Sequence, residues 1–312
     1  MIGILIFPGF QLLDATGPAA VFEIARRYSS NVPAVRMITP EPGAIKSSSG
    51  IEILASGLDD GVELSTLIVA GGEGITSVLE REVISSYLRM LAQSGVRIAS
   101  VCSGAYLLAQ AGLLEGLRAT THWSCSADFA SRYPNVKLEP ESIFVCDSGI
   151  WTSAGISAGI DLALAIIGED CGDAVVARTA HQLVLYNYRS GTEPQISTLL
   201  EMKMPGSRFN DLLLWIRENL TASLTVDRLA EQVGMSPRHF SRMFHSETGM
   251  TPAKAIERMR VEVARQRVEA SDEVIELVAY NTGFGDPERM RRAFMRAFGQ
   301  PPRSLRRTAR SQ

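Results

Sequence analysis

One pattern is written twice in this chain, as LTVDRLAEQVGMSPRHFSRMFHSETG at residues 224–249 and as VIELVAYNTGFGDPERMRRAFMRAFG at residues 274–299. In the first copy, apolar side chains recur at the i, i+3, i+4 and i+7 spacing of a short amphipathic helix. These side chains are Val226, Leu229, Ala230 and Val233. Gly234 ends this helix as a C-cap glycine does, and Ser236 with Pro237 opens the next as N-cap and first helical residue. The first copy therefore predicts a helix, a glycine turn and a second helix.

The second copy repeats these features further along the chain. Its apolar stripe lies 49 residues after the first, and one inserted residue then makes the offset 50. The matched pairs are Val226/Ile275, Leu229/Val278, Ala230/Ala279, Val233/Thr282, Ser236/Asp286, Phe240/Met290, Arg242/Arg292, Phe244/Phe294, Gly249/Gly299 and Pro252/Pro302. Repetition of the caps together with the stripe indicates a duplicated structural unit.

Two helices joined by a short glycine turn form a helix-turn-helix, in which small residues such as Ala230 and Ala279 allow close helix packing. The second helix of such a unit enters the major groove of DNA, where its outward side chains meet base edges. The side chains predicted to contact DNA are Arg238, His239, Ser241 and Arg242 in the first copy and Glu288, Arg289, Arg291 and Arg292 in the second. A continuous helical pattern over residues 252–270 joins the copies. A rigid spacer that holds the two reading helices about 34 Å apart would place them in successive major grooves.

This stretch resembles the DNA-binding domain of the AraC/XylS transcription regulators, which is two helix-turn-helix units joined by a helix. The resemblance is carried by Leu229-Ala230, Gly234-Met235-Ser236, Phe240-Ser241-Arg242-Met243-Phe244, Thr248-Gly249, Ala279, Gly283-Phe284, Arg292-Ala293-Phe294, Phe298-Gly299 and Pro301-Pro302. The sequence departs from the family at Pro287, where many relatives have a polar side chain. The resemblance implies sequence-specific binding to double-stranded DNA and, since most relatives are activators, contact with RNA polymerase.

The distribution of charge supports this interpretation. At 312 residues the chain is long enough for two domains of about 150 residues each. Residues 1–206 contain 13 basic and 21 acidic side chains, a net charge of −8, whereas residues 207–312 contain 18 basic and 13 acidic ones, a net charge of +5. A basic carboxy-terminal end suits contact with DNA phosphates, and an acidic remainder is expected to stay off the DNA.

Several classes of protein are disfavoured by the sequence. The chain has no run of eighteen apolar residues, and its first residues lack the basic region of a signal peptide, so we expect a cytoplasmic protein that does not bind membranes. The cysteines Cys102, Cys125, Cys146 and Cys171 lack CxxC spacing and neighbouring histidine pairs. They indicate neither a metal site nor a disulfide framework, and no cofactor is expected.

The amino-terminal part alternates short apolar runs with helical patterns, as an α/β fold does. Strands are predicted at residues 3–7, 35–39, 51–54 and 67–70, and a helix is predicted to begin near Gly17-Pro18. Asp14 falls between the first strand and that helix, at the sheet edge where open α/β folds place their binding sites. Gly71 and Gly72 follow a later strand, and backbone N–H groups in such a turn are able to face an anion.

The most informative amino-terminal segment is VRIASVCSGA at residues 96–105. A buried strand ends at Cys102 and a helix starts immediately afterwards, which is the strand-turn-helix geometry of a nucleophile elbow. A thiol at a helix N-terminus feels the positive end of the helix dipole, so the sequence predicts a favoured thiolate. His122, twenty residues later, is a candidate to contact that thiol.

These residues resemble the PfpI/ThiJ superfamily, which is related to class I glutamine amidotransferases and has a flavodoxin-like α/β sandwich with a cysteine on the elbow. The resemblance covers about residues 1 to 190 and is carried by Leu13-Asp14-Ala15-Thr16-Gly17-Pro18, Ala70-Gly71-Gly72, Ser100-Val101-Cys102-Ser103-Gly104, Ala119-Thr120-Thr121-His122-Trp123 and Thr152 to Asp161. It implies that Cys102 occupies the place of the family's nucleophile. At the acidic position that contacts the cysteine, this chain has aspartate, Asp14, as the isonitrile hydratases do, whereas other branches have glutamate.

With both halves assigned, the chain resembles the GlxA group of AraC-type regulators from end to end. The expected architecture is a flavodoxin-like α/β domain at residues 1–190, a linker at residues 191–207 and an all-α tandem helix-turn-helix domain at residues 208–312. In that group the amino-terminal domain is usually taken to sense a small nitrogen compound and to dimerise. The resemblance therefore implies a homodimer with a small-molecule effector bound near Asp14, Gly71, Gly72, Cys102, Ser103 and His122.

Two functions remain open from the sequence. The first is a cytoplasmic transcription regulator in which the Cys102 elbow lines a ligand pocket or has become an inert buried thiol. The second is a cysteine-dependent hydratase or hydrolase fused to a DNA-binding module, with Cys102, Asp14 and His122 as its candidate catalytic residues. Asp14 beside the elbow keeps this chemistry possible, whereas the duplicated, arginine-rich end favours regulation.

Overall fold

The computed structural model describes residues 1–58, 61, 63–79, 81–203 and 206–310. The chain divides into two compact units, Met1–Gln195 and Ile196–Gln312. Part of the predicted linker at residues 191–207 belongs to these units, because residues 191–195 pair with the first and a short helix, α8 (Thr198–Met202), lies in the second. Met204 and Pro205, which also fall in that linker, lie outside the described residues.

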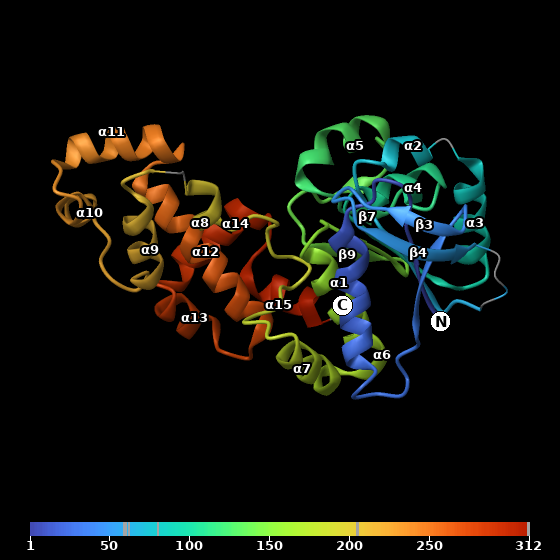
Figure 1. The fold of residues 1–312 in the computed structure, drawn as a ribbon. Coiled ribbons are helices and arrows are strands. Elements are labelled where there is room, and N and C mark those ends of the chain that lie inside the picture. The colour runs from blue at the N-terminus through green and yellow to red at the C-terminus, as the bar shows by residue number, and fades with distance from the viewer. Residues whose placement is uncertain (59–60, 62, 80, 204–205, 311–312) are drawn as a thin grey trace. The chain divides into compact units, whose positions relative to one another are not determined.

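The first unit is built on an eight-stranded sheet with the order β3-β4-β2-β1-β5-β6-β10-β9 (Figure 1). Its strands are β1 (Ile2–Leu5), β2 (Val35–Thr39), β3 (Gly43–Lys46), β4 (Glu52–Gly57), β5 (Thr66–Val69), β6 (Arg97–Val101), β9 (Phe144–Asp147) and β10 (Ile150–Ser153). Pairing is parallel from β4 to β10 and antiparallel at the two edges. Every residue of β1 and β5 is buried, as expected for central parallel strands covered on both faces.

Helices cover both faces of this sheet (Figure 1). One layer packs α1 (Leu12–Ala25), α6 (Ala158–Cys171) and α7 (Asp173–Gln182) together. On the other side α2 (Ile75–Leu79) and α3 (Glu82–Gln93) pack on α4 (Ala105–Gln110), and α5 (Ser126–Arg132) follows. A two-stranded parallel ladder of β7 (Arg118–Ala119) and β8 (Lys137–Leu138) completes the unit. The predicted α/β sandwich is confirmed.

The first helix begins earlier than the sequence predicted. It starts at Leu12, so Asp14 lies in its first turn and Pro18 lies inside the helix. A proline inside a helix removes one intrahelical hydrogen bond, and this helix packs closely against α6. A Cβ at Gly17 would be only 3.2 Å from Ile160, and a Cβ at Gly159 only 3.4 Å from Pro18.

The second unit is all helical: α8, α9 (Asn210–Glu218), α10 (Val226–Gln232), α11 (Pro237–Thr248), α12 (Pro252–Ala270), α13 (Ile275–Asn281), α14 (Pro287–Phe298) and α15 (Pro302–Arg310) (Figure 1). The sequence repeat is also a repeat of caps. The side chains of Ser236 and Asp286 cap α11 and α14, each followed by a proline in the first turn. Pro287 therefore occupies the same helix-starting position as Pro237.

Helix α12 belongs to both cores of this unit. The first core contains buried side chains of α10 and α11, including Leu229, Phe240 and Phe244, together with Phe209 at the N-cap of α9, and α12 adds Ile256 and Met259 to it. The second core contains Val278, Met290 and Phe294, and α12 adds Val261, Ala264 and Val268. Because one continuous helix is packed into both cores, the two helix-turn-helix units are held at a fixed separation.

A backbone contact strengthens this connection. Leu220, after α9, places its carbonyl against the turn of the second helix-turn-helix, where a Cβ added to Gly283 would be 1.8 Å from that oxygen. The guanidinium of Arg260 on α12 donates to the same carbonyl at 2.9 and 2.7 Å and to the Ala222 carbonyl at 3.2 Å. The segment after α9 is thus joined, through Leu220 and Arg260, to the turn of the second helix-turn-helix.

We predict that Gly283→Ala destabilises the helical unit more than Gly234→Ala does. Both glycines have positive φ, 82° and 64°, so both substitutions carry the left-handed backbone cost of about 1–2 kcal/mol. Only Gly283 faces the Leu220 carbonyl, whereas a Cβ at Gly234 meets nothing within 4 Å. Urea unfolding followed by circular dichroism measures the difference, and equal losses of stability would contradict the predicted clash.

Candidate ligand pocket and nucleic-acid interface

Asp14 is a fully buried carboxylate beside the elbow. Its oxygens accept hydrogen bonds from the backbone N–H groups of Gly71 at 3.1 Å and Ile156 at 2.8 Å. Burial raises the pKa of Asp14 to about 6, because removal from water disfavours the carboxylate more than these hydrogen bonds favour it. Asp14 therefore carries its negative charge at neutral pH and loses it in mild acid.

Cys102 follows β6 on a strained turn, as the sequence predicts for an elbow. Its φ of 58° is in the left-handed region, which costs a non-glycine residue of order 1–3 kcal/mol. Two glycines press against it, since a Cβ at Gly71 would be 2.7 Å and one at Gly155 2.3 Å from the Cys102 Cβ. The Thr121 hydroxyl donates to the Cys102 carbonyl at 3.0 Å. The surrounding backbone therefore holds the thiol in one position.

The charge state of this thiol differs from the sequence-based expectation of a favoured thiolate. Burial raises the pKa of Cys102, and the negative charge of Asp14 raises it further. The backbone N–H of Ser103 opposes the shift only in part. The thiolate is disfavoured because desolvation has the largest effect on this thiol, although helix α4 follows the Cys102–Gly104 turn directly. Cys102 is therefore a protonated thiol at neutral pH.

A cavity of about 370 Å³ opens beside the elbow. Of the residues predicted to bind ligand, Gly72, Cys102, Ser103 and His122 line it. Asp14 and Gly71 do not line it, because they lie behind the thiol and hold it. The Gly72 N–H donates to the Ser103 hydroxyl at 2.9 Å, which joins the glycine turn to the elbow.

His122 faces this cavity, but its imidazole hydrogen-bonds to Ser124 rather than to the thiol. The Nδ1 atom lies 2.7 Å from the Ser124 hydroxyl, and the Ser124 N–H points to the same nitrogen at 3.4 Å. Burial lowers the pKa of the imidazole, so His122 is neutral at pH 7. This arrangement suits a residue that shapes the pocket.

Other lining residues escaped the sequence analysis: Gln11, Glu73, Ile75, Thr76, Leu79, Tyr106, Ser124, Cys125, Asp128, Arg132 and Ile156. Tyr106 lies four residues after Cys102, on the same helix face, and this spacing is a signal that could have identified it. Its hydroxyl donates to Asp128 at 2.8 Å, and Asp128 pairs with Arg132 at 2.9 Å. Glu73 directly follows Gly72, and Ser124 and Cys125 lie within three residues of His122, whereas Gln11 and Ile156 come from segments distant in sequence.

We predict that iodoacetamide labels Cys102 slowly at pH 8 and that labelling continues to accelerate above pH 9. The thiolate reacts, and burial together with the Asp14 charge keeps it scarce at lower pH. Asp14→Asn removes that charge, so its pH profile should move to lower pH. Mass spectrometry of the full chain gives the rates, with Cys171, outside this pocket, as internal reference. A profile that moves upward in Asp14→Asn would contradict this account.

The predicted DNA-contacting side chains project from α11 and α14. Arg238, His239 and Arg242 are exposed, and Ser241 is half-buried. Glu288, Arg289, Arg291 and Arg292 are all exposed on α14. Four of these side chains interact with one another in pairs in the absence of DNA. Arg242 lies 3.2 Å from the His239 ring, and Arg291 donates to both oxygens of Glu288 at 2.8 and 2.7 Å.

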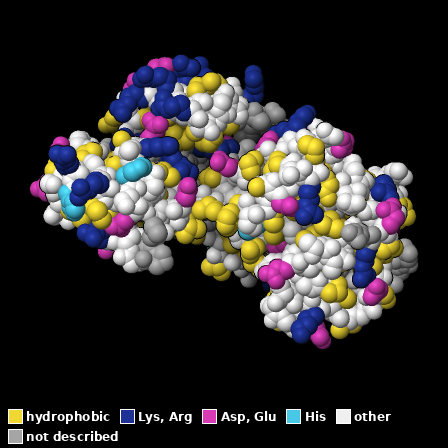
Figure 2. All heavy atoms as spheres, turned by 90° about the horizontal axis from the view of Figure 1, so that it is seen from above, with side chains coloured by type: hydrophobic (Ala, Val, Ile, Leu, Met, Phe, Trp, Pro, Cys, Tyr) yellow, Lys and Arg dark blue, Asp and Glu magenta, His cyan; other side chains and the backbone are white. Residues whose placement is uncertain are grey.

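Arginines surround a hollow of about 360 Å³ between α12 and α14. Arg289, Arg292 and Arg296 occur at i, i+3 and i+7 on α14, and Arg260 faces them from α12. Among the described residues that line the hollow, Glu257 is the only acidic one, and it pairs with Arg296 at 2.8 Å. Burial and the neighbouring charge of Arg289 lower the pKa of Arg260. Figure 2 shows Lys and Arg side chains gathered on the helical unit.

Such a positive hollow suits a phosphate group, because only one carboxylate offsets four guanidinium groups. It has lining residues from both helix-turn-helix regions, Leu224 before α10 and Phe284 before α14. On straight DNA, the stretch between two successive major grooves presents the minor groove and its flanking phosphates. We therefore expect a DNA phosphate to occupy the hollow between α12 and α14.

We predict that Arg296→Gln weakens DNA binding similarly for all sequences and lowers the slope of log K against log salt by about 1, as loss of one phosphate contact does. Glu257→Gln should tighten binding, because it removes the carboxylate that pairs with Arg296. Fluorescence anisotropy at several salt concentrations measures both. A sequence-dependent loss in Arg296→Gln would instead assign Arg296 to base contact.

Comparison with known proteins identifies the family. Residues 1–169 match the DJ-1/PfpI family, and residues 229–308 match a helix-turn-helix domain family. The chain belongs to the DJ-1/PfpI family and carries a helix-turn-helix domain at its carboxy-terminal end. It is an AraC-family transcriptional regulator with a DJ-1/PfpI amino-terminal domain, as its similarity to the following proteins supports.

The HTH-type transcriptional regulator GlxA of Rhizobium meliloti (strain 1021) is 32% identical over 316 residues, which cover 98% of this chain and 95% of that protein. An isonitrile hydratase of Pseudomonas putida is 33% identical over 175 residues, 55% of this chain and 72% of that enzyme. The crystal structure of an AraC family transcriptional regulator from Pseudomonas putida matches with a TM-score of 0.54 at 21% identity, over 58% of this chain and 98% of that one. Similarity to a regulator is thus end to end, and similarity to the enzyme is partial.

No helix in the described part of the chain is long and apolar enough to cross a membrane. Nor do the described residues contain a group of three or more His, Cys, Asp or Glu side chains arranged to hold a metal ion.

Proposed function

We propose that this regulator reads two successive major-groove blocks of DNA with α11 and α14. The duplicated caps carry this proposal, because Ser236-Pro237 and Asp286-Pro287 start the two helices in the same way. The equivalent arginines Arg242 and Arg292 are both exposed. An arginine bidentate to guanine contributes about 1–3 kcal/mol of discrimination. The two reading helices therefore give two blocks of preference on one DNA site.

We further propose that the cavity beside Cys102 binds the effector, a small nitrogen-containing metabolite. The volume of about 370 Å³ suits a small molecule, and the Glu73 carboxylate on its wall suits N–H donors. The buried Asp14 carboxylate adds negative charge behind Cys102. Ligand binding changes DNA affinity only if the ligand binds two arrangements of the protein with different affinity.

The proposed working form is a homodimer that activates transcription in the cytoplasm, with RNA polymerase as its partner. Similarity to AraC/XylS regulators supports activation. Dimerisation through the α/β unit would place two readers on paired half-sites, which fits the symmetry common among DNA-binding regulators.

Selection of bound sequences from random DNA tests the dual-reader proposal. The full-length protein should enrich two major-groove blocks about 10 bp apart, centre to centre. Arg242→Ala should lose preference in one block and Arg292→Ala in the other, because the two positions are equivalent in the repeat. Enrichment of a single block, or loss of the same block in both variants, would refute the proposal that α11 and α14 each read one block.

The second candidate function is a cysteine-dependent hydratase or hydrolase that acts at the elbow. The adjacency of Asp14 to the Cys102 thiol favours it, together with partial similarity to an isonitrile hydratase. The raised thiol pKa and the engagement of His122 with Ser124 weigh against an activated nucleophile. We therefore propose that the elbow serves binding and not turnover.

A further inference from the structure

The side chain of Gln195, the last residue of the first unit, is bonded to more neighbours than its half-buried position suggests. Its amide nitrogen lies within donating distance of the Thr121 carbonyl (2.8 Å), the Pro140 carbonyl (2.9 Å), the Ser142 carbonyl (3.2 Å) and the Thr120 hydroxyl (3.3 Å). Its amide oxygen accepts from the Trp123 N–H at 2.9 Å. One amide thus joins residues 120–123 to residues 140–142.

The segment before Gln195 is also attached to the first unit. The Ile143 N–H donates to the Glu193 carbonyl at 3.1 Å, and the Phe144 N–H donates to the Gly191 carbonyl at 3.3 Å. The Gln195 N–H in turn donates to the Glu141 carbonyl at 2.9 Å. Residues 191–195 therefore run along residues 141–144 as an added edge, and they end at the start of the second unit.

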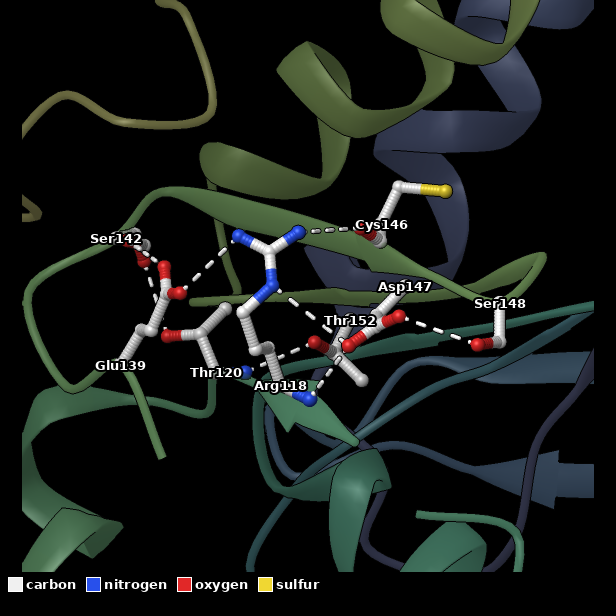
Figure 3. Close-up of polar contacts among 8 residues, drawn as sticks. All are labelled: Arg118, Thr120, Glu139, Ser142, Cys146, Asp147, Ser148 and Thr152. Atoms are coloured by element: carbon white, nitrogen blue, oxygen red, sulfur yellow. Dashed lines mark hydrogen bonds and ion pairs between the residues drawn. The ribbon is translucent and has the colours of Figure 1, made fainter. Parts of the chain in front are cut away.

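A polar network holds residues 118–120, which lead into the segment that Gln195 contacts (Figure 3). The Thr120 N–H donates to the Thr152 hydroxyl at 2.8 Å, and the Thr120 hydroxyl donates to the Ser142 carbonyl at 3.0 Å. Glu139 connects Ser142 to Arg118 at 3.0 and 3.3 Å. These contacts hold Thr120, whereas His122 lines the cavity and the next residue, Trp123, donates its backbone N–H to Gln195.

We infer that Gln195 couples occupancy of the Cys102 cavity to the junction between the two units. A molecule in the cavity contacts His122. Displacement of His122 moves the adjacent Trp123, whose backbone N–H donates a hydrogen bond to the Gln195 amide oxygen. Loss of that bond weakens the attachment of residues 191–195, so the junction is released when the cavity is filled. Gln195 is a positioning residue in this scheme, and the inference rests on the proposed effector role of the cavity.

The test uses a carboxamidomethyl group on Cys102 as the cavity occupant, because it requires no knowledge of the natural ligand. The parent is the full-length chain with Cys125, Cys146 and Cys171 replaced by alanine, labelled with iodoacetamide at high pH. DNA dissociation constants are measured with and without the label on a site obtained by selection. In the parent we expect the label to change affinity by about 5- to 150-fold, the usual range of allosteric coupling.

Gln195→Ala in that parent should bind DNA when unlabelled but respond to the label by less than about twofold, since the connection is absent. Gln182→Ala is the matched control, because it removes an exposed glutamine of α7 whose side chain, among the described residues, accepts a hydrogen bond only from Tyr28, at 3.4 Å. This control should retain the full response. Hydrogen exchange of residues 196–203 gives a second readout, with faster exchange on labelling in the parent and equal exchange in Gln195→Ala.

The outcomes separate this inference from the proposed function. A full response in Gln195→Ala overturns the role of Gln195 and leaves the effector function intact. No response in the parent overturns both, because no coupling then exists for Gln195 to carry. Failure of the unlabelled parent to bind any selected DNA contradicts DNA reading itself. If Gln195→Ala does not fold, Gln195→Met, which keeps the side-chain length without hydrogen bonds, takes its place with the same expected result.

Discussion

The fixed relation between the two helix-turn-helix units depends on α12. This one helix supplies Ile256 and Met259 to the first core and Val261, Ala264 and Val268 to the second, so it is part of both cores. The Leu220 carbonyl, held by Arg260 against the Gly283 turn, adds a contact that does not pass along the helix. A reader of two major grooves requires such rigidity, because a loose spacer loses the geometric match to DNA.

The α/β unit is organised around a different constraint. A strained cysteine is held between glycines and in front of a buried carboxylate, and the hydrogen bonds from Gly71 and Ile156 keep that carboxylate in place. This geometry comes from a fold whose relatives include enzymes, yet here burial keeps the thiol protonated. The same fold therefore provides a well-formed pocket without an activated nucleophile, which is consistent with regulation as the shared property of the end-to-end relatives.

Much of this arrangement is predictable from sequence because it is local. Caps, glycine turns and apolar stripes depend on neighbours within a few residues, so the two helix-turn-helix units and the Cys102 elbow could be predicted. The start of α1 could not, since Pro18 indicates a helix start in the sequence but lies inside a helix that begins at Leu12. The pKa of Cys102 was predicted in the wrong direction because the burial that raises it depends on the tertiary structure. Gln195, whose partners are more than fifty residues away, gave no sequence signal.

The fixed separation of the two readers is the central claim, and a spacing series tests it most directly. The affinity of the full-length protein is measured for DNA sites whose two selected blocks are moved apart or together one base pair at a time. A rigid spacer predicts one optimum near 10 bp and a steep loss on either side, because each base pair also rotates the second block around the helix axis. A flat dependence on spacing would contradict the account and indicate two readers that move independently.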